Sequence, residues 1–500
     1  MGTAEVWLGN ESWPNNKSCK SFAEDVFRIS GAKTDKEKAL AFYDWFTRCM
    51  MRGANLQIPD GAGGYSRCYD SLALLTSWGH GECTFWGWVA TECLVSAGLK
   101  ARRVVVHNQG HTYYEIFYKG DDGVEQWHAF DPFGGWYFVN EAGEVASCEQ
   151  LAENPQLAQN PLPGHPVPLG HHPDRASLGH RHRTEDQIFV DQPIHNEKNI
   201  WKLKSGMEVV MNFMPQVPHL GLFTDIRSDG PRRNGSHDDM TEDSRLGIKQ
   251  YQNHKPYWEN YLWPSDARGG VNEGRPVRWH GEGALRWKPL QQNLSNACEV
   301  RNAVIKNGAL SPSGSHEFME VWYHIELPYM ASYIMADYDV VGAGGDFFGL
   351  CISADDRKSW WPMPLKSNSP HYGVTSNGQK QWLDKTSSVQ GLKEFWLRID
   401  MVSHHDNISL AMQSLNLTIG FQHNMHVQPR LLPGKNELWL DCEKNQDGVN
   451  VTAEWVYQKD GKQFIESLEN SKEGKVSNSL SIDGNCPSEI KMSSVRLIAK

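Results

Sequence analysis

The stretch that decides the fold runs from residue 81 to residue 131: GECTFWGWVATECLVSAGLKARRVVVHNQGHTYYEIFYKGDDGVEQWHAFD. Residues 83–97 are apolar on most sides, which predicts a buried helix, and Gly98 fits its C-cap. Runs rich in β-branched and aromatic residues follow, with Gly-Asp-Asp-Gly at 120–123 as a hairpin turn. A helix that leads into an antiparallel sheet predicts an α+β fold. The strands are expected at 102–107, 111–118 and 125–131.

Three polar residues stand at the ends of these elements. Cys83 opens the helix, where the partial positive charge of a helix N-terminus stabilises a thiolate and first-turn amides can hold an oxyanion. His111 begins the second strand, and Asp131 ends the third, where Pro132 stops the ladder. Adjacent antiparallel strands can bring these two ends together, so that the carboxylate orients an imidazole that serves the thiol as a base. This ordered set predicts cysteine acyl-transfer chemistry.

The residues before this stretch are expected to be largely helical. Residues 20–54 carry apolar side chains at a period near 3.6, with Thr34 as an N-cap and Gly53 as a stop. A Gly-rich loop with a short helical piece at 71–77 follows. A further strand is expected at 136–140, beyond the stretch quoted above.

The run from about residue 20 to residue 140 resembles the catalytic core of the transglutaminase-like superfamily of papain-type cysteine enzymes. The motifs that carry the resemblance are Lys38-Ala-Leu-Ala-Phe-Tyr-Asp-Trp, Gly81-Glu-Cys, Ala101-Arg-Arg-Val, His111-Thr-Tyr-Tyr-Glu and Trp127 with Asp131-Pro. The resemblance implies that Cys83 is the nucleophile, that His111 is the base and acid, and that Asp131 orients the histidine. Phe133 stands where many members have Thr. The resemblance covers about a quarter of the chain and implies a fold and a nucleophile, not a substrate.

Four further side chains are candidates for substrate binding or for stabilising the oxyanion. Trp45 or Trp78 could donate an indole N–H to the oxyanion, as a tryptophan does in some members of the superfamily. His107 could contact substrate, although a surface histidine at a strand end is the simpler interpretation. Tyr113 lies two residues after His111 and therefore on the same strand face.

Other polar residues of this region have structural interpretations. His128 should point to the opposite strand face from the triad carboxylate, because side chains alternate along a strand. Glu82 and Glu115 could be acids near the site. Glu115 shares a strand face with the triad histidine, so an ion pair with Arg102 or Arg103 is the simpler account.

The length of 500 residues exceeds one hydrophobic core and predicts several domains. Residues 1–150 are expected to form the transglutaminase-like cysteine-enzyme core, and residues 151–190 a Pro-, Gly- and His-rich linker or cleft loop. Residues 191–429 predict a β-rich domain, and residues 430–500 a small β-sandwich-like domain. The clearest strands of the β-rich part are expected at 318–327, 333–341, 394–402 and 410–421.

Neither a metal nor a cofactor is expected. The ten cysteines include no CxxC pair, which argues against a structural zinc site of the kind that peptide N-glycanases of the superfamily carry. The histidines between His165 and His182 could bind a metal, but they lack a fixed ligand spacing, so a polar loop is the preferred interpretation, and it could lie over the cleft. Cys442 and Cys486 could bridge two strands.

The composition argues against several classes of binding partner. The net charge of −11 argues against nucleic acid and anionic membranes, and no run of about 18 apolar residues could span a bilayer. The first residues lack the basic and apolar regions of a signal peptide, and we expect a secreted or periplasmic protein whose leader is absent from this chain. The tandem Trp360-Trp361 must point to opposite faces of a strand, so one ring should be exposed and able to stack on a sugar or peptide.

Four functions remain open at this point. The leading hypothesis is a cysteine hydrolase that cleaves an amide bond of a peptide, isopeptide or glycopeptide through an acyl-enzyme on Cys83. The second is transglutaminase-type acyl transfer to an amine. The third is a polysaccharide lyase or glycosidase, in which His111, Tyr113 and Tyr114 would matter more than the thiol and the β-rich part would bind carbohydrate. The fourth, a binding protein with a relic core, is disfavoured by an intact triad.

Overall fold

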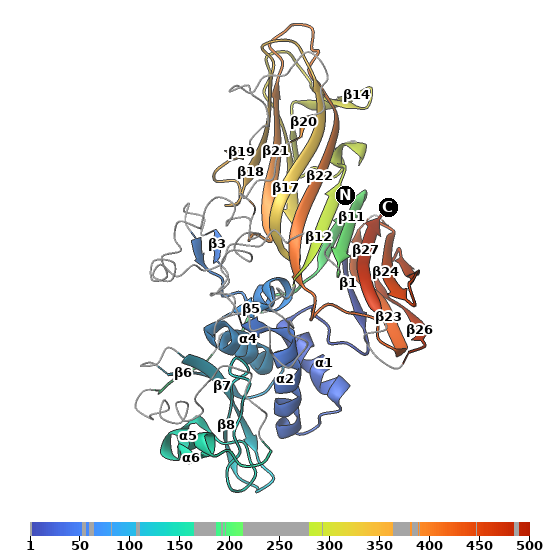
Figure 1. Cartoon of the computed structure of the whole chain (residues 1–500). Helices are drawn as coiled ribbons and strands as arrows, with labels where there is room; N and C mark the ends of the chain where they lie inside the picture. The colour runs from blue at the N-terminus through green and yellow to red at the C-terminus, as the bar shows by residue number, and fades with distance from the viewer. Residues whose placement is uncertain are drawn as a thin grey trace.

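Figure 1 shows the computed structural model of the chain, in which helices and a small sheet form one end and long antiparallel strands form the other. We call these parts the helical half (residues 19–164 and 187–190) and the β half (strand β1 and the strands from β10 onward). The residues described are 3–52, 57–59, 65–81, 83–106, 111–164, 187–191, 194–195, 197–213, 280–292, 294–363, 381–382, 389, 391–446, 448–484 and 490–500.

Two helices, α1 (Cys19–Ser30) and α2 (Asp35–Cys49), stand where the sequence predicts helical residues between 20 and 54. Gly31 adopts the left-handed conformation with φ 68°, which ends α1, and Thr34 caps α2 by accepting from the Glu37 amide. The expected stop at Gly53 is wrong. The second helix ends at Cys49, and the chain becomes extended at once as β2 (Met51–Arg52).

The segment before Cys83 is a short helical turn that changes from α to π geometry. A short α3 (Ser71–Ala73) continues into a π-helical turn, η1 (Leu74–Trp78), and Gly79 closes it with φ 70°. The two-residue strand β5 (His80–Gly81) pairs in parallel with β2. Helix α4 (Cys83–Ser96) then begins, so the chain reaches Cys83 from a rigid turn buried in the helical core.

The predicted sheet is present and lies beside α4. Strands β6 (Ala101–Val106), β7 (His111–Lys119) and β8 (Glu125–Phe130) pair antiparallel in the order β8-β7-β6-β9. The hairpin between β7 and β8 turns at residues 120–123, with Gly123 at φ 82°. A strand at 136–140 was expected and is wrong. Those residues make only isolated bridges, Asp131 with Trp136 and Val139 with Val145.

Residues 151–190 contribute ordered structure to the helical half at both ends. Helix α5 (Cys148–Glu153) and helix α6 (Gln156–Gln159) pack under the sheet, and β9 (Gln187–Val190) pairs with β6. The histidines from His165 to His182 lie outside the described residues. Residues 187–190 therefore belong to the same sheet as β6, β7 and β8 and form its fourth strand.

Three antiparallel sheets make up the β half, and their apolar faces share one buried core. The four-stranded sheet has the order β10-β1-β23-β26, the five-stranded sheet has the order β13-β16-β21-β18-β19, and the largest contains β14, β15, β17, β20, β22, β12, β11, β27, β24 and β25. The bounds are β1 Thr3–Asn10, β10 Trp201–Lys204, β11 Met207–Asn212, β12 His280–Trp287, β13 Glu299–Arg301, β14 Ala303–Lys306, β15 Ala309–Pro312, β16 Met319–Glu326, β17 Met330–Val341, β18 Phe347–Ser353, β19 Trp361–Pro362, β20 Gln381–Trp382, β21 Glu394–Val402, β22 Ala411–Asn424, β23 Gly434–Gln446, β24 Val451–Lys459, β25 Lys462–Asn470, β26 Gly474–Ile482 and β27 Lys491–Ala499.

Hydrogen-bonded ladders cross the domain boundaries that the sequence suggested. The N-terminal strand β1 lies between β10 and β23, and β27 pairs with β11. Residues 3–10 and 430–500 therefore share sheets with the residues between 191 and 429. The division into folding units stays a prediction, because sheet continuity does not say which segments fold alone.

The two halves are joined next to the turn that precedes Cys83. The Asn424 side chain donates to the carbonyls of Cys49, at 2.7 Å, and Leu75, at 2.8 Å. The Lys393 ammonium lies 2.6 Å from Asp70, the residue that caps α3, and 3.2 Å from Glu197. The β half thus buttresses the segment that positions Cys83. Among the described residues, no helix is both long enough and apolar enough to cross a bilayer.

Candidate active site

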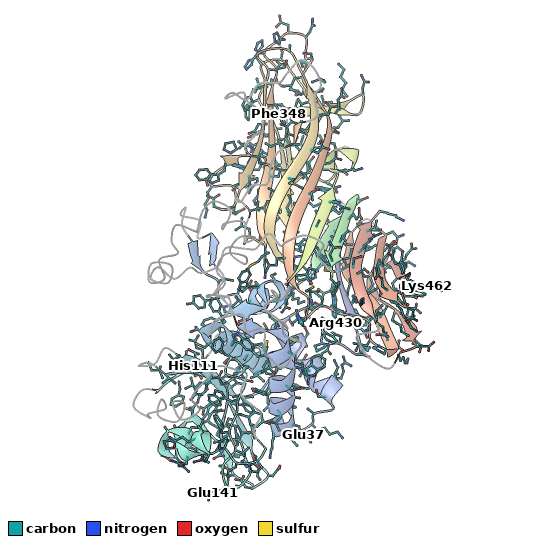
Figure 2. The ribbon with its side chains drawn as sticks, viewed as in Figure 1. Glu37, His111, Glu141, Phe348, Arg430 and Lys462 are labelled. Carbon is teal, nitrogen blue, oxygen red and sulfur yellow. The ribbon has the colours of Figure 1, made fainter. Side chains whose placement is uncertain are left out.

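The fold brings Cys83, His111 and Asp131 together. His111 begins β7 and lies where the sheet meets α4 (Figure 2). Its Nε2 lies 2.5 Å from Oδ2 of Asp131, and its ring also interacts with the Cys83 thiol by a side-chain hydrogen bond. Because Asp131 occupies Nε2, the ring nitrogen left for the thiol is Nδ1. The arrangement is a continuous chain from thiol to imidazole to carboxylate.

All three residues have low solvent exposure, and Asp131 has the least. The His111 side chain is 13% exposed and the Asp131 side chain is 0% exposed, while Cys83 keeps 9% of its surface. A buried carboxylate needs partners, and Asp131 has two oxygens to satisfy. Oδ2 is hydrogen-bonded to the His111 imidazole, and Oδ1 accepts a hydrogen bond from the Gly134 amide at 2.7 Å. The carboxylate is therefore fixed, whereas the thiol end of the chain can meet a substrate.

Electrostatics favour a charged imidazole. Burial alone would lower the pKa of His111. The charge of Asp131 and the hydrogen bonds to Asp131 and Cys83 outweigh burial and raise the pKa to about 10. An imidazolium beside a thiol stabilises the thiolate, which is the nucleophilic form. The same imidazolium can later give its proton to a leaving amine.

A tight turn after Asp131 sets the carboxylate. The Asp131 amide donates to the Trp136 carbonyl at 2.9 Å, and the Trp136 amide donates to the Asp131 carbonyl at 3.0 Å. Inside this turn, a Cβ on Gly134 would lie 2.4 Å from Nε1 of Trp136 and 2.6 Å from Oδ2 of Asp131. Only glycine fits there without moving the carboxylate. Sequence reasoning did not single out Gly134, although the Asp-Pro-Phe-Gly run is a turn signal.

Aromatic rings enclose the imidazole. Phe133 lies with its ring centroid 6.0 Å from His111 and 6.2 Å from Trp86. The Trp86 indole donates to the Gly81 carbonyl at 3.0 Å, which ties the first turn of α4 to the strand before it. Neither role of Trp86 was predicted. The signal available was its position three residues after Cys83, which places it on the same side of a helix.

The four candidates for substrate or oxyanion contact are placed differently. Trp45 packs on Trp13, with ring centroids 5.3 Å apart, and Trp78 is fully buried in the helical core. Tyr113 is also fully buried and packs on Trp136, at 5.5 Å. His107 lies outside the described residues, as does Glu82. The catalytic roles of these side chains stay predictions.

The other polar residues take the structural roles expected of them. Glu115 pairs with Arg102, whose Nε lies 2.9 Å from Oε2, and it accepts the Cys148 amide at 2.8 Å. His128 stacks on Tyr118 and lies 2.5 Å from the Val145 carbonyl, on the strand face away from the triad. Cys442 carries a free thiol, and its suggested partner Cys486 lies outside the described residues.

One group in the described part of the chain could hold a metal ion, and it lies in the β half. The ligand atoms of His324, Glu326 and Glu394 lie within 4.8 Å of one another. His324 already bonds to Glu394 at 2.8 Å, and Lys202 contacts Glu326. The two carboxylates thus have partners within the protein, so the cluster does not require a metal.

Comparison with known proteins adds no assignment. No family model matches the chain, and no curated protein matches it.

Proposed function

We propose that this protein is a cysteine hydrolase with a transglutaminase-like core that cleaves an amide bond through an acyl-enzyme on Cys83. The observation that carries the proposal is the continuous hydrogen-bonded chain from Cys83 through His111 to Asp131 at the N-terminus of α4. The order of helix, Cys, strand, His, strand and Asp supports the resemblance to that superfamily. Its substrates are amides of the peptide, isopeptide or glycopeptide kind.

The geometry supports a two-step reaction. The Cys83 thiolate attacks the carbonyl carbon, and first-turn amides of α4 stabilise the oxyanion. His111 gives its proton to the leaving amine as the C–N bond breaks, which leaves a thioester on Cys83. Neutral His111 then takes a proton from water, and the resulting hydroxide attacks the thioester. The carboxylate product leaves, and the thiolate–imidazolium pair returns.

Burial bears on the polysaccharide alternative. That reading relies on Tyr113 and Tyr114 acting with His111, yet both tyrosines are fully buried. Burial raises the pKa of both phenols, which disfavours their use as bases. Of these groups only Cys83 and His111 keep some exposed surface, and this favours nucleophilic catalysis over lyase chemistry.

The test compares two thiols of the same chain. We expect iodoacetamide at pH 7 to alkylate Cys83 faster than the exposed Cys298, because a thiolate reacts whereas a thiol does not. Peptide mapping after timed alkylation measures both rates. Slower labelling of Cys83 than of Cys298 would contradict a thiolate–imidazolium pair.

Turnover gives the second readout. Cys83→Ala should abolish hydrolysis of peptide and glycopeptide amides, whereas Cys93→Ala, ten residues along the same helix and fully buried, should retain it. Unchanged turnover in Cys83→Ala would end the proposal. If ammonia is released while an added amine is incorporated, the same site performs acyl transfer, and the acceptor rather than the nucleophile is revised.

A further inference from the structure

A cation and two aromatic rings lie along α4 beyond the nucleophile. The Arg103 guanidinium lies 4.8 Å from the centroid of the Trp88 ring. The Trp88 indole donates to the Tyr69 carbonyl at 2.9 Å, and the two rings are 4.9 Å apart. Tyr69 is 42% exposed, so the group reaches the surface. We call Arg103, Trp88 and Tyr69 the arginine subsite.

This subsite lies close to Cys83 along the same helix. Trp88 lies one turn after Thr84 on the same side of α4, and the hydroxyl of Thr84, next to Cys83, lies 3.5 Å from that of Thr112, next to His111. On this side of the helix the missing side chain of Gly87 lets Arg103 approach, since a Cβ there would be 3.4 Å from Cγ of Arg103 and 3.0 Å from Thr112. The arginine subsite is therefore next to the residues that flank Cys83 and His111.

Arg103 differs from its neighbour Arg102 in having no acidic partner among the described residues. Arg102 is neutralised by Glu115 at 2.7 Å. The Nε atom of Arg103 is buried and has no hydrogen-bond partner within the described part of the chain. Burial lowers the pKa of Arg103, and no carboxylate offsets that cost. A guanidinium nevertheless remains charged in proteins, so this half-buried cation is left to be paired from outside.

A carboxylate is the ligand that such a group suits best. Guanidinium and carboxylate form paired, charge-assisted hydrogen bonds, and they are strong where water is partly excluded. The Trp88 ring holds the guanidinium plane, which lowers the entropy lost on binding. Tyr69 adds an exposed ring on which a peptide backbone can pack.

We propose that the arginine subsite selects peptide substrates that carry Asp or Glu near the scissile amide. This inference rests on the proposed function, because it assigns specificity to the same site. It makes Arg103 a specificity-determining residue, while the bond cleaved is still attacked by Cys83. An acidic peptide, rather than a neutral or basic one, is the preferred acyl donor.

The experiment uses paired fluorogenic peptides with Glu or Gln at one position, scanned from three residues before to three residues after the scissile bond. We expect kcat/KM of the full-length protein to favour Glu over Gln by about tenfold at one position, which corresponds to one charge-assisted hydrogen-bonded pair. The ratio should fall as salt increases. Arg103→Gln should bring it close to one, and Arg103→Lys should keep part of it.

Charge reversal gives a gain that misfolding cannot mimic. Arg103→Glu should favour a Lys peptide over a Gln peptide at the same position. The matched control is Arg48→Gln, which removes another arginine lying near a tryptophan, 6.0 Å from the Trp45 ring and on α2. This control should keep the wild-type preference for Glu.

The outcomes separate the two proposals. If the wild-type protein cleaves peptides with no preference for Glu at any position, or if Arg103→Gln keeps the preference, the arginine subsite is wrong and the hydrolase proposal stands. If Cys83 is not alkylated faster than Cys298 and no peptide is cleaved, the proposed function itself fails. A preference that follows the charge at position 103 supports both.

Discussion

The helical half and the β half use arginines and aromatic rings in different ways. On the outer face of the five-stranded sheet, Arg398 lies over Trp360 at 4.4 Å and Arg357 over Trp396 at 4.7 Å, so cations and rings stack on one another. In the helical half, Arg102 pairs with Glu115, whereas Arg103 lies against a ring and has no acidic partner among the described residues. The difference teaches that arginines stacked on rings within the protein stabilise a sheet, while an arginine without an acidic partner near a proposed active site points to a ligand.

The largest effect expected is on the triad. Asp131→Asn should reduce kcat by about 10³- to 10⁴-fold, because the amide cannot hold the imidazole as the carboxylate does or stabilise its charge. Steady-state turnover of a peptide substrate measures the loss. The rate of Cys83 alkylation at pH 7 should fall with it, and an unchanged alkylation rate would show that Asp131 does not support the thiolate.

The turn after Asp131 should give the next largest effect. In Gly134→Ala the added Cβ would overlap Nε1 of Trp136 and Oδ2 of Asp131, so the carboxylate must shift. A displacement of about 1 Å can cost about 100-fold in rate, and we expect a loss of that order in kcat. Gly344→Ala is the control, because its Cβ would meet nothing within 4 Å and, like Gly134, it does not have a positive φ. Equal losses of kcat in both variants would contradict a positioning role.

Stability against pH tests the charge on the triad imidazole. The pKa of His111 is raised from 6.5 to about 10, so the folded state binds its proton more tightly than the unfolded state. The stabilisation is complete below about pH 6.5 and is lost as the pH rises through about 10. The difference in unfolding free energy between wild type and His111→Asn should therefore be a few kcal/mol at pH 6 and shrink towards pH 10. A difference that grows with pH would reverse the assignment.

The junction between the halves should show a moderate effect. Lys393→Met leaves Asp70 and Glu197 without their shared cation, and we expect a loss of about 1 to 3 kcal/mol because the group is partly screened. Urea unfolding followed by tryptophan fluorescence and by circular dichroism measures it. If the unfolding curves from the two probes no longer coincide in the variant, the two halves are distinct folding units. If the curves still coincide, the two halves unfold together.

The smallest effect on catalysis is expected in the β half. Trp360→Ala removes the ring between Trp322, at 5.2 Å, and Arg398, and should lower stability by about 1 to 2 kcal/mol. The kcat of peptide hydrolysis should not change. A fall in kcat would show that the outer face of the sheet contributes to the site after all.

The neighbouring ring shows what strand periodicity could and could not predict. Trp361, the first residue of β19, is 61% exposed, while Trp360, just before the strand, packs on Trp322, so one ring of the tandem is exposed as expected. Which of the two would be exposed was undetermined, because that depends on the partner sheet. The exposed ring remains a candidate for stacking on a ligand.

Local signals in the sequence determined the helix at Cys83, the hairpin at 120–123 and the strand ends at His111 and Asp131. These follow from caps, turns and periodicities that act within a few residues. The same signals failed for residues 136–140, where the backbone is bonded across a turn to Asp131 rather than in a ladder. Hydrophobic pattern alone does not distinguish these two ways of satisfying a buried backbone.

Only the tertiary structure decided which charges are paired. The sequence left Glu115 with either Arg102 or Arg103, and the register of β6 against β7 pairs Arg102 with Glu115 and leaves Arg103 against Trp88. It also decided that β1 lies between β10 and β23 and that the β half supports the turn before Cys83. Such contacts join residues hundreds of positions apart, and their free energy depends on the burial and geometry reached only when the whole chain has folded.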